Sequence, residues 1–136
     1  MRGLLPLSNQ LIDDALNSNR DLIAPPSSYA YLIALRAERK PLLVITASSR
    51  AAEDLAKEIK ECHPATLEFP AWETLPHERL SPSSDTVAKR ISTLQALQDQ
   101  KKNWVVVAPI RAVIHKFNAQ IVNTQPITLD RGIEFD

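Results

Sequence analysis

The sequence has little glycine and cysteine. Gly3 and Gly132 are the only two glycines, and Cys62 is the single cysteine among 136 residues. A nucleotide-binding P-loop needs glycines whose backbone amides surround phosphate, and neither glycine is placed to supply one. A single thiol also excludes an internal disulfide and suits a reducing compartment.

Long apolar runs and an excess of one charge are also missing. No run approaches the ~20 apolar residues that span a bilayer, and no secretion signal is present, so we expect a cytoplasmic protein without membrane contact. Sixteen basic residues balance sixteen acidic ones, whereas proteins that bind nucleic acid unaided are usually basic. Any contact with DNA is therefore expected to be local.

Metal-binding and catalytic patterns are missing as well. His63, His77 and His115 stand far apart, and Cys62 has no second cysteine near it, so no zinc-binding spacing is present. No serine occupies a G-x-S-x-G nucleophile motif. We therefore expect no metal, no cofactor and no catalytic residue in this chain.

What the sequence does contain is an alternation of strand and helix signals, in a composition typical of globular domains (44% apolar, 24% charged). Short apolar runs predict strands at 21–24, 42–46, 65–69 and 104–108. Helices are predicted at 8–16 and 29–39, after a cap at Ser48 or Ser49, after a cap at Ser84, and at 110–117. This order indicates an α/β fold of three layers, a mostly parallel sheet with helices on both faces. The domain is expected to span residues 1–120, and residues 121–136 to begin a following, truncated segment.

Apolar residues at helical spacing predict the buried side of each helix. These sides should hold the helices against the sheet. The expected positions are Tyr31, Leu32 and Leu35 in the helix at 29–39, Ala52, Leu55, Ala56 and Ile59 in the next helix, and Val87, Ile91, Leu94 and Leu97 in the helix after Ser84.

The segment from Phe69 to Thr86 is unusual in composition. It has the sequence FPAWETLPHERLSPSSDT, with three prolines, one of the two tryptophans and three acidic residues. Prolines and polar residues exclude the interior of a helix or strand. Phe69, Trp72 and Leu75 are apolar anchors that a slack linker would not need, so we expect an ordered connection.

The same segment resembles a known family. The matching features are W-E-T-L-P (Trp72–Pro76), S-P-x-x-D (Ser81, Pro82, Asp85), an amphipathic helix, and a strand that ends in V-A-P-x-R-A (Val107–Ala112). In this order they are similar to the N-terminal region of the bacterial transcription-repair coupling factors (Mfd), whose first domains resemble the excision-repair protein UvrB. The resemblance is strongest from about residue 42 to 114 and weakest in the first twenty residues.

The resemblance implies a degenerate P-loop, helicase-like domain that acts in transcription-coupled nucleotide excision repair. In the family, ATP and Mg belong to later motor domains that translocate on double-stranded DNA, while the UvrB-like module supports recruitment of UvrA to stalled RNA polymerase and restrains the motor by contacts with other domains. At the place of the UvrB ATP loop, residues 24–29 (APPSSY) have no glycine and no lysine, and two prolines lack amide hydrogens. We therefore expect no ATP hydrolysis by this chain.

The family motif supplies the candidate contact surface. Trp72 could stack on a base or a partner, or it could anchor the segment from within. Arg90 and Arg111 could contact phosphate, or pair with an acid such as Glu73, Glu78 or Asp85. The candidate residues are Trp72, Glu73, Thr74, Leu75, Pro76, Ser81, Pro82, Asp85, Arg90 and Arg111.

Two other functions compete with this interpretation. One is a DNA-backbone-binding helicase subdomain of a UvrB-type protein, with Thr46, Ser48, Ser49 and Arg50 as the contacts; the balanced net charge argues against it. The other is a small α/β enzyme that uses the carboxylates of the segment. It has the least support, because no nucleophile, metal set or cofactor loop accompanies them.

Overall fold

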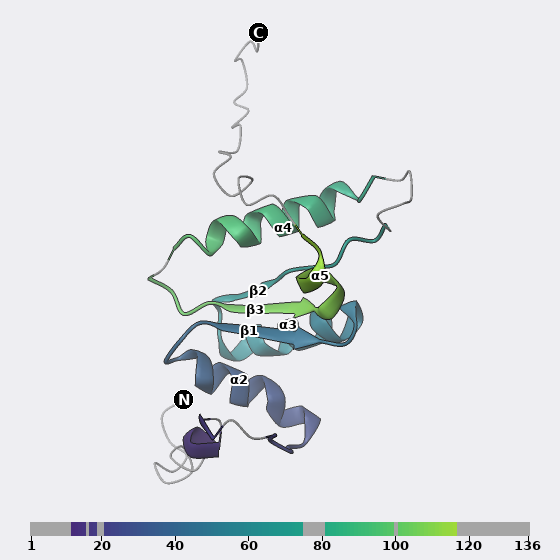
Figure 1. Cartoon of the computed structure of the whole chain (residues 1–136). Coiled ribbons are helices and arrows are strands. Elements are labelled where there is room, and N and C mark those ends of the chain that lie inside the picture. The colour runs from purple at the N-terminus through teal and green to yellow at the C-terminus, as the bar shows by residue number, and fades with distance from the viewer. Residues whose placement is uncertain (1–11, 16, 19–20, 75–80, 100, 117–136) are drawn as a thin grey trace.

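A computed structural model describes the chain over residues 12–15, 17–18, 21–74, 81–99 and 101–116. Its centre is a sheet of three parallel strands in the order β1-β3-β2, formed by β1 (Leu42–Thr46), β3 (Val105–Pro109) and β2 (Thr66–Glu68) (Figure 1). All five residues of β3 are buried. A continuous apolar run is what a central parallel strand requires, and the predicted parallel sheet is confirmed.

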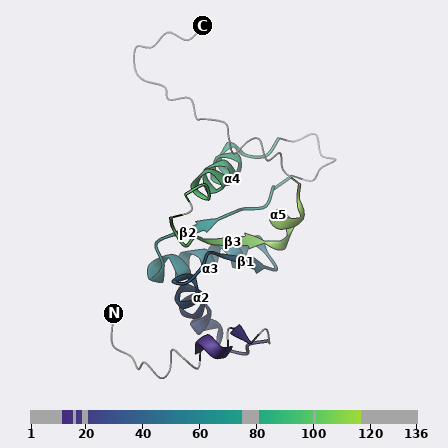
Figure 2. The ribbon, with the colours of Figure 1, turned by 60° about the vertical axis from the view of Figure 1, so that its left-hand side comes forward.

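Helices form layers on both faces of the sheet. A 3-10 turn, η1 (Pro26–Ser28), leads into α2 (Tyr29–Ala37), which lies with α3 (Ser49–Cys62) on one face, while α4 (Ser84–Ala96) covers the other (Figure 1, Figure 2). The chain passes from β1 through α3 to β2, and returns through α4 to β3. Right-handed crossovers in opposite directions place their helices on opposite faces, so the connectivity accounts for the three predicted layers.

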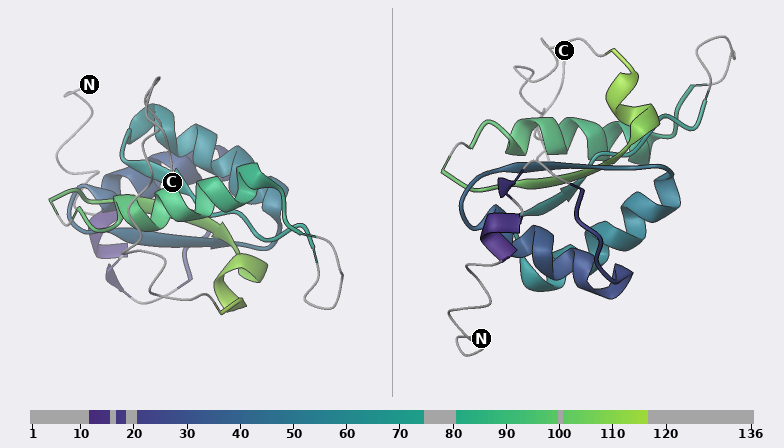
Figure 3. Two further views of the ribbon diagram at one scale, coloured as in Figure 1. Left: turned by 90° about the horizontal axis from the view of Figure 1, so that it is seen from above. Right: turned by 60° about the horizontal axis from the view of Figure 1, so that its bottom comes forward.

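The α3 layer follows its sequence pattern. Ser48 caps the helix by accepting a hydrogen bond from the backbone N–H of Ala51, as predicted. Ala52, Ala56 and Ile59 are buried against the sheet, and Leu55 packs beside them partly exposed. The views of Figure 3 show α2 and α3 side by side beneath the strands.

The α2 layer buries different residues from those predicted. Its buried positions are Ala30, Ala34 and Ala37, spaced by four and three residues, whereas Tyr31 is exposed. The prediction for this helix was wrong because it favoured large side chains. Alanine allows α2 to approach α3 closely, and the two helices share one core cluster with Val105 and Val107 of β3.

Two predicted elements end differently in the structure. Residues 21–24 form no strand: Ile23 is 97% exposed, and the prolines that follow cannot donate to a ladder. Because no strand precedes residues 24–29 in the described chain, the decayed nucleotide loop stays a prediction. The first helix is described only at residues 12–15 and 17, which are helical.

The last described element is α5 (Ile110–Ile114), a short helix directly after β3. It begins where the sequence predicts it and ends earlier than residue 117, which lies outside the described residues, as does the predicted boundary at 120–121. No helix in the described ranges is long and apolar enough to cross a membrane.

Candidate functional site

The family motif continues from the end of β2 towards the start of α4. Phe69 and Ala71 are buried and join Val106, Ala108 and Ala112 in a second core cluster, on the α4 side of the sheet. Residues 69–74 belong to no helix or strand, so their order comes from contacts with other elements. The candidate residues Leu75 and Pro76 lie outside the described residues.

Polar side chains form the buried side of α4. Its three buried residues are Thr86, Arg90 and Thr93, spaced by four and three residues on one face of the helix. The apolar stripe predicted for this helix is not its buried side: Val87, Ile91 and Leu94 are half-buried and Leu97 is exposed. Buried polar groups need hydrogen-bond partners, and each of the three finds one between residues 68 and 73.

Thr93 and Arg90 bind the first half of this stretch. The Thr93 hydroxyl donates to the carbonyl of Glu68 at 2.9 Å, and Nη1 of Arg90 donates to the carbonyl of Pro70 at 2.6 Å. The Arg90 guanidinium carbon lies 4.0 Å from the ring centre of Phe69 and 4.3 Å from that of Trp72. These two rings replace part of the water that the buried cation has lost.

Burial has an electrostatic cost at Arg90. The residue is only 3% exposed, and this burial lowers the pKa of its guanidinium. Its Nη2 has no hydrogen-bond partner among the described residues. No ion pair joins Arg90 to the two described acids of the motif, so the predicted pairing with Glu73 or Asp85 is wrong.

Glu73 binds the second half of the stretch to the start of α4. Its carboxylate accepts hydrogen bonds from the Ser83 backbone N–H at 3.2 Å, from the Ser83 hydroxyl at 2.7 Å, and from the Thr86 hydroxyl. These bonds favour the charged carboxylate and lower the pKa of Glu73 to about 2, with Thr86 contributing most.

The cap of α4 is therefore made by residues distant in sequence. Ser83, not the predicted Ser84, is the N-cap, because its Oγ accepts from the N–H of Thr86 at 3.3 Å. In a capping box, an acid at the third helical position bonds the N–H of the cap residue. Thr86 holds that position here, and Glu73 supplies the carboxylate from ten residues upstream.

We call this set of contacts the α4 clamp: Thr86, Arg90 and Thr93 of α4, with Glu73 and the carbonyls of Glu68 and Pro70. The clamp fixes both ends of residues 68–73 on one helix. Its carboxylate already accepts three hydrogen bonds and its cation lies between two rings. The clamp therefore positions the chain and offers no free acid–base pair.

The remaining candidates are spread over the surface. Ser81, Asp85 and Arg111 are exposed, while Thr74 and Pro82 are half-buried. Arg111 is on α5 and has no hydrogen bond or ion pair with another described residue. Trp72, half-buried and in contact with Arg90, has the anchoring role that was one of its two predicted alternatives.

The residues of the DNA-backbone alternative meet at the carboxyl end of β1, an edge where parallel sheets often bind ligands. The hydroxyl of Thr46 donates to the carbonyl of Ser48 at 2.9 Å, and the Ser48 hydroxyl is occupied by the helix cap. Arg50 lies 3.8 Å from Asp54, and Ser49 is exposed. Two of the four side chains are therefore already used by the turn.

Sequence reasoning missed the roles of Thr86 and Thr93. Their spacing with Arg90 was present in the sequence, but polar residues at helical spacing are usually assigned to the solvent side. A buried polar face is recognised only when its partners are known. Within the described ranges, no three His, Cys, Asp or Glu side chains come together in a group that could hold a metal ion.

Comparison with known proteins gives the family. No family model matches the chain. The transcription-repair-coupling factors of Mycobacterium bovis and Mycobacterium tuberculosis are each 40% identical to it over 120 residues, 83% of the chain. The factor of Haemophilus influenzae is 32% identical over 75 residues, 54% of the chain. The chain spans 10% of the length of the mycobacterial proteins. The resemblance found in the sequence is thus confirmed, and the chain is homologous to a segment of the transcription-repair-coupling factors.

Proposed function

We propose that this chain is a non-catalytic, UvrB-like module that acts in transcription-coupled nucleotide excision repair. The observation that carries the proposal is 40% identity over 120 residues to proteins named transcription-repair-coupling factors. The module would support recruitment of UvrA and restrain an ATP-driven translocase to which it belongs. RNA polymerase and double-stranded DNA would be partners of the whole protein.

The non-catalytic part of the proposal is supported by how the motif residues are used. Glu73 and Arg90, the most reactive-looking pair in the sequence, are engaged in the α4 clamp. At residues 24–29 the chain forms η1, where the Ser28 hydroxyl donates to the carbonyl of Pro25 at 2.7 Å. Calorimetric titration with ATP and magnesium should show no binding; an affinity in the micromolar range would contradict the proposal.

Titration of the purified chain with UvrA tests recruitment. Asp85 and Arg111 are the exposed charged candidates, so Asp85→Lys and Arg111→Glu should each weaken binding about tenfold if the motif forms the contact. Glu58→Lys is the matched control, because Glu58 is an exposed acid on α3, in the layer beneath the other sheet face. Binding that all three variants retain would place the contact elsewhere. A folded chain that does not bind UvrA would contradict the recruitment role.

DNA-backbone binding remains a second candidate because Ser49 and Arg50 are exposed at the carboxyl end of β1. Backbone binding depends on phosphate neutralisation, so its affinity would fall steeply with salt. Arg50→Ala should then lower DNA affinity without lowering thermal stability. Affinity that is independent of salt, or that Arg50→Ala leaves unchanged, would dismiss this candidate.

A further inference from the structure

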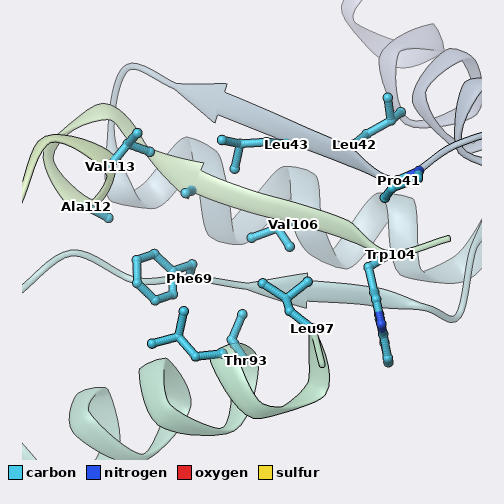
Figure 4. Close-up of a pocket in the computed structure, with 12 residues that line it drawn as sticks. Pro41, Leu42, Leu43, Phe69, Thr93, Leu97, Trp104, Val106, Ala112 and Val113 are labelled. Atoms are coloured by element: carbon cyan, nitrogen blue, oxygen red, sulfur yellow. The ribbon is translucent and has the colours of Figure 1, made fainter. Parts of the chain in front are cut away.

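An apolar groove lies on the α4 side of the sheet, beside the α4 clamp (Figure 4). It has a volume of about 380 Å³ and is lined by β1, β3, α4 and α5, together with residues that flank these elements. The lining side chains that matter below are Leu43, Leu97, Trp104, Val113 and Thr93.

The groove exists because the two sheet faces are covered unequally. On one face, α2 and α3 pack over β1 and β3. On the other face, α4 contacts β2 and leaves β1 uncovered among the described residues. Leu43 and Ile45 alternate along β1 and therefore share that face, where they are 57% and 49% exposed. The uncovered strip is where a further helix of a three-layer fold would lie.

Polar groups of the lining are already paired. Thr93 donates to the carbonyl of Glu68 at 2.9 Å, and the indole N–H of Trp104 donates to the carbonyl of Asp99 at 3.0 Å. A small-molecule pocket needs a few free polar groups that orient its ligand. This lining provides apolar surface instead, which suits the side chains of a polypeptide.

The rim of the groove is basic. Lys40 precedes the lining residue Pro41, Arg111 precedes Ala112, and the Lys102 ammonium lies 5.0 Å from the ring centre of Trp104. All three cations are exposed, and none has an ion pair within the described chain. A segment with acidic flanks would complement this rim.

We propose that the groove docks an amphipathic helix of a partner protein, with apolar residues at i, i+3, i+4 and i+7 and acidic residues on both sides of that stripe. Helices of this kind bind apolar grooves through such anchors. The apolar anchors would cover Leu43, Leu97 and Val113, and the acids would face Lys40, Lys102 and Arg111. The inference stands apart from the proposed role in repair.

Two synthetic 18-residue helical peptides test it by fluorescence anisotropy with the full chain. Both carry the same apolar stripe, one flanked by glutamate and the other by lysine. The glutamate peptide should bind at least about tenfold more tightly, and salt should weaken it, because the rim charges are exposed. Lys102→Glu with Arg111→Glu should reverse the preference.

Groove substitutions complete the test. Leu43→Asp should abolish binding of the glutamate peptide, while Ile23→Asp, at a 97% exposed residue outside the lining, should leave it unchanged. Circular dichroism of each variant verifies folding. Equal binding of the two peptides, binding that survives Leu43→Asp, or no binding by either peptide would each overturn the proposal.

Discussion

The two faces of the sheet are held in different ways. Beneath the sheet, α2 and α3 meet the strands through buried alanines, Ile59 and valines, and each of these contacts is apolar and without direction. Above it, α4 buries Thr86, Arg90 and Thr93, whose bonds to Glu68, Pro70 and Glu73 have fixed geometry. The lower face should therefore supply most of the stability, and the upper face should define where the motif segment lies.

Apolar burial scales with area, whereas a hydrogen bond gives a modest net gain and a large loss when one partner is removed. The consequence is that apolar substitutions on the lower face should lower stability in proportion to volume. Substitutions in the α4 clamp should depend on the shape and donors of the new side chain. Four changes separate these behaviours.

The largest loss is expected for Ile59→Ala on the lower face. Ile59 is fully buried, so the change should lower the free energy of unfolding by about 2–5 kcal/mol. Urea unfolding measures the difference. Ile23→Ala, at the 97% exposed isoleucine, is the control and should stay within about 0.5 kcal/mol of the unchanged chain. A similar loss for both would show that the lower face is not the main source of stability.

Arg90→Met should cost about 1.5–3 kcal/mol, since it removes a charged hydrogen bond from the buried side of α4. Arg90→Lys keeps the charge but not the planar group between Phe69 and Trp72, so we expect it to resemble the methionine variant. Arg111→Met, at an exposed arginine, is the control in urea unfolding. A fully stable Arg90→Lys would mean that charge alone, rather than stacking, holds the segment.

Ser83→Ala should cost about 1 kcal/mol, because it removes the side-chain cap of α4. The matched control is Ser84→Ala, one residue later, which removes a hydroxyl that does not cap the helix. Thermal unfolding of the two variants compares them directly. If Ser84→Ala were the more damaging change, the cap would lie where the sequence had predicted it.

The contrast between the faces also explains what the sequence could predict. Strands at 42–46 and 104–108 were found because continuous apolar runs are typical of buried parallel strands, and both lie within one residue of β1 and β3. The α3 stripe was found because its apolar spacing and its burial agree. These elements depend on local pattern and on apolar area, which are properties of the sequence itself.

The α4 clamp depends on pairs that are far apart in the chain. Glu73 caps a helix that begins ten residues later, and Arg90 bonds a carbonyl twenty residues upstream. The sequence marked Glu73 and Arg90 as unusual through the family motif, but their partners were assigned wrongly. Hydrogen-bond partners at this separation follow from the fold, and the fold has to be known first.

The smallest effect is expected for Glu73→Gln, and it should appear as a change in pH dependence. The pKa of Glu73 is about 2 in the folded chain, below its usual 4.5. The unfolded chain therefore takes up this proton first as the pH falls, so the contribution of Glu73 is complete above about pH 4.5 and is lost towards pH 2. Glutamine cannot titrate, and the variant should lose stability less steeply in this window, as measured by urea unfolding at several pH values. Glu58→Gln, at an exposed acid on α3, should retain the original slope. If Glu73→Gln retained it as well, the carboxylate would not be charged within the clamp, and the long-range cap of α4 would rest on Ser83 alone.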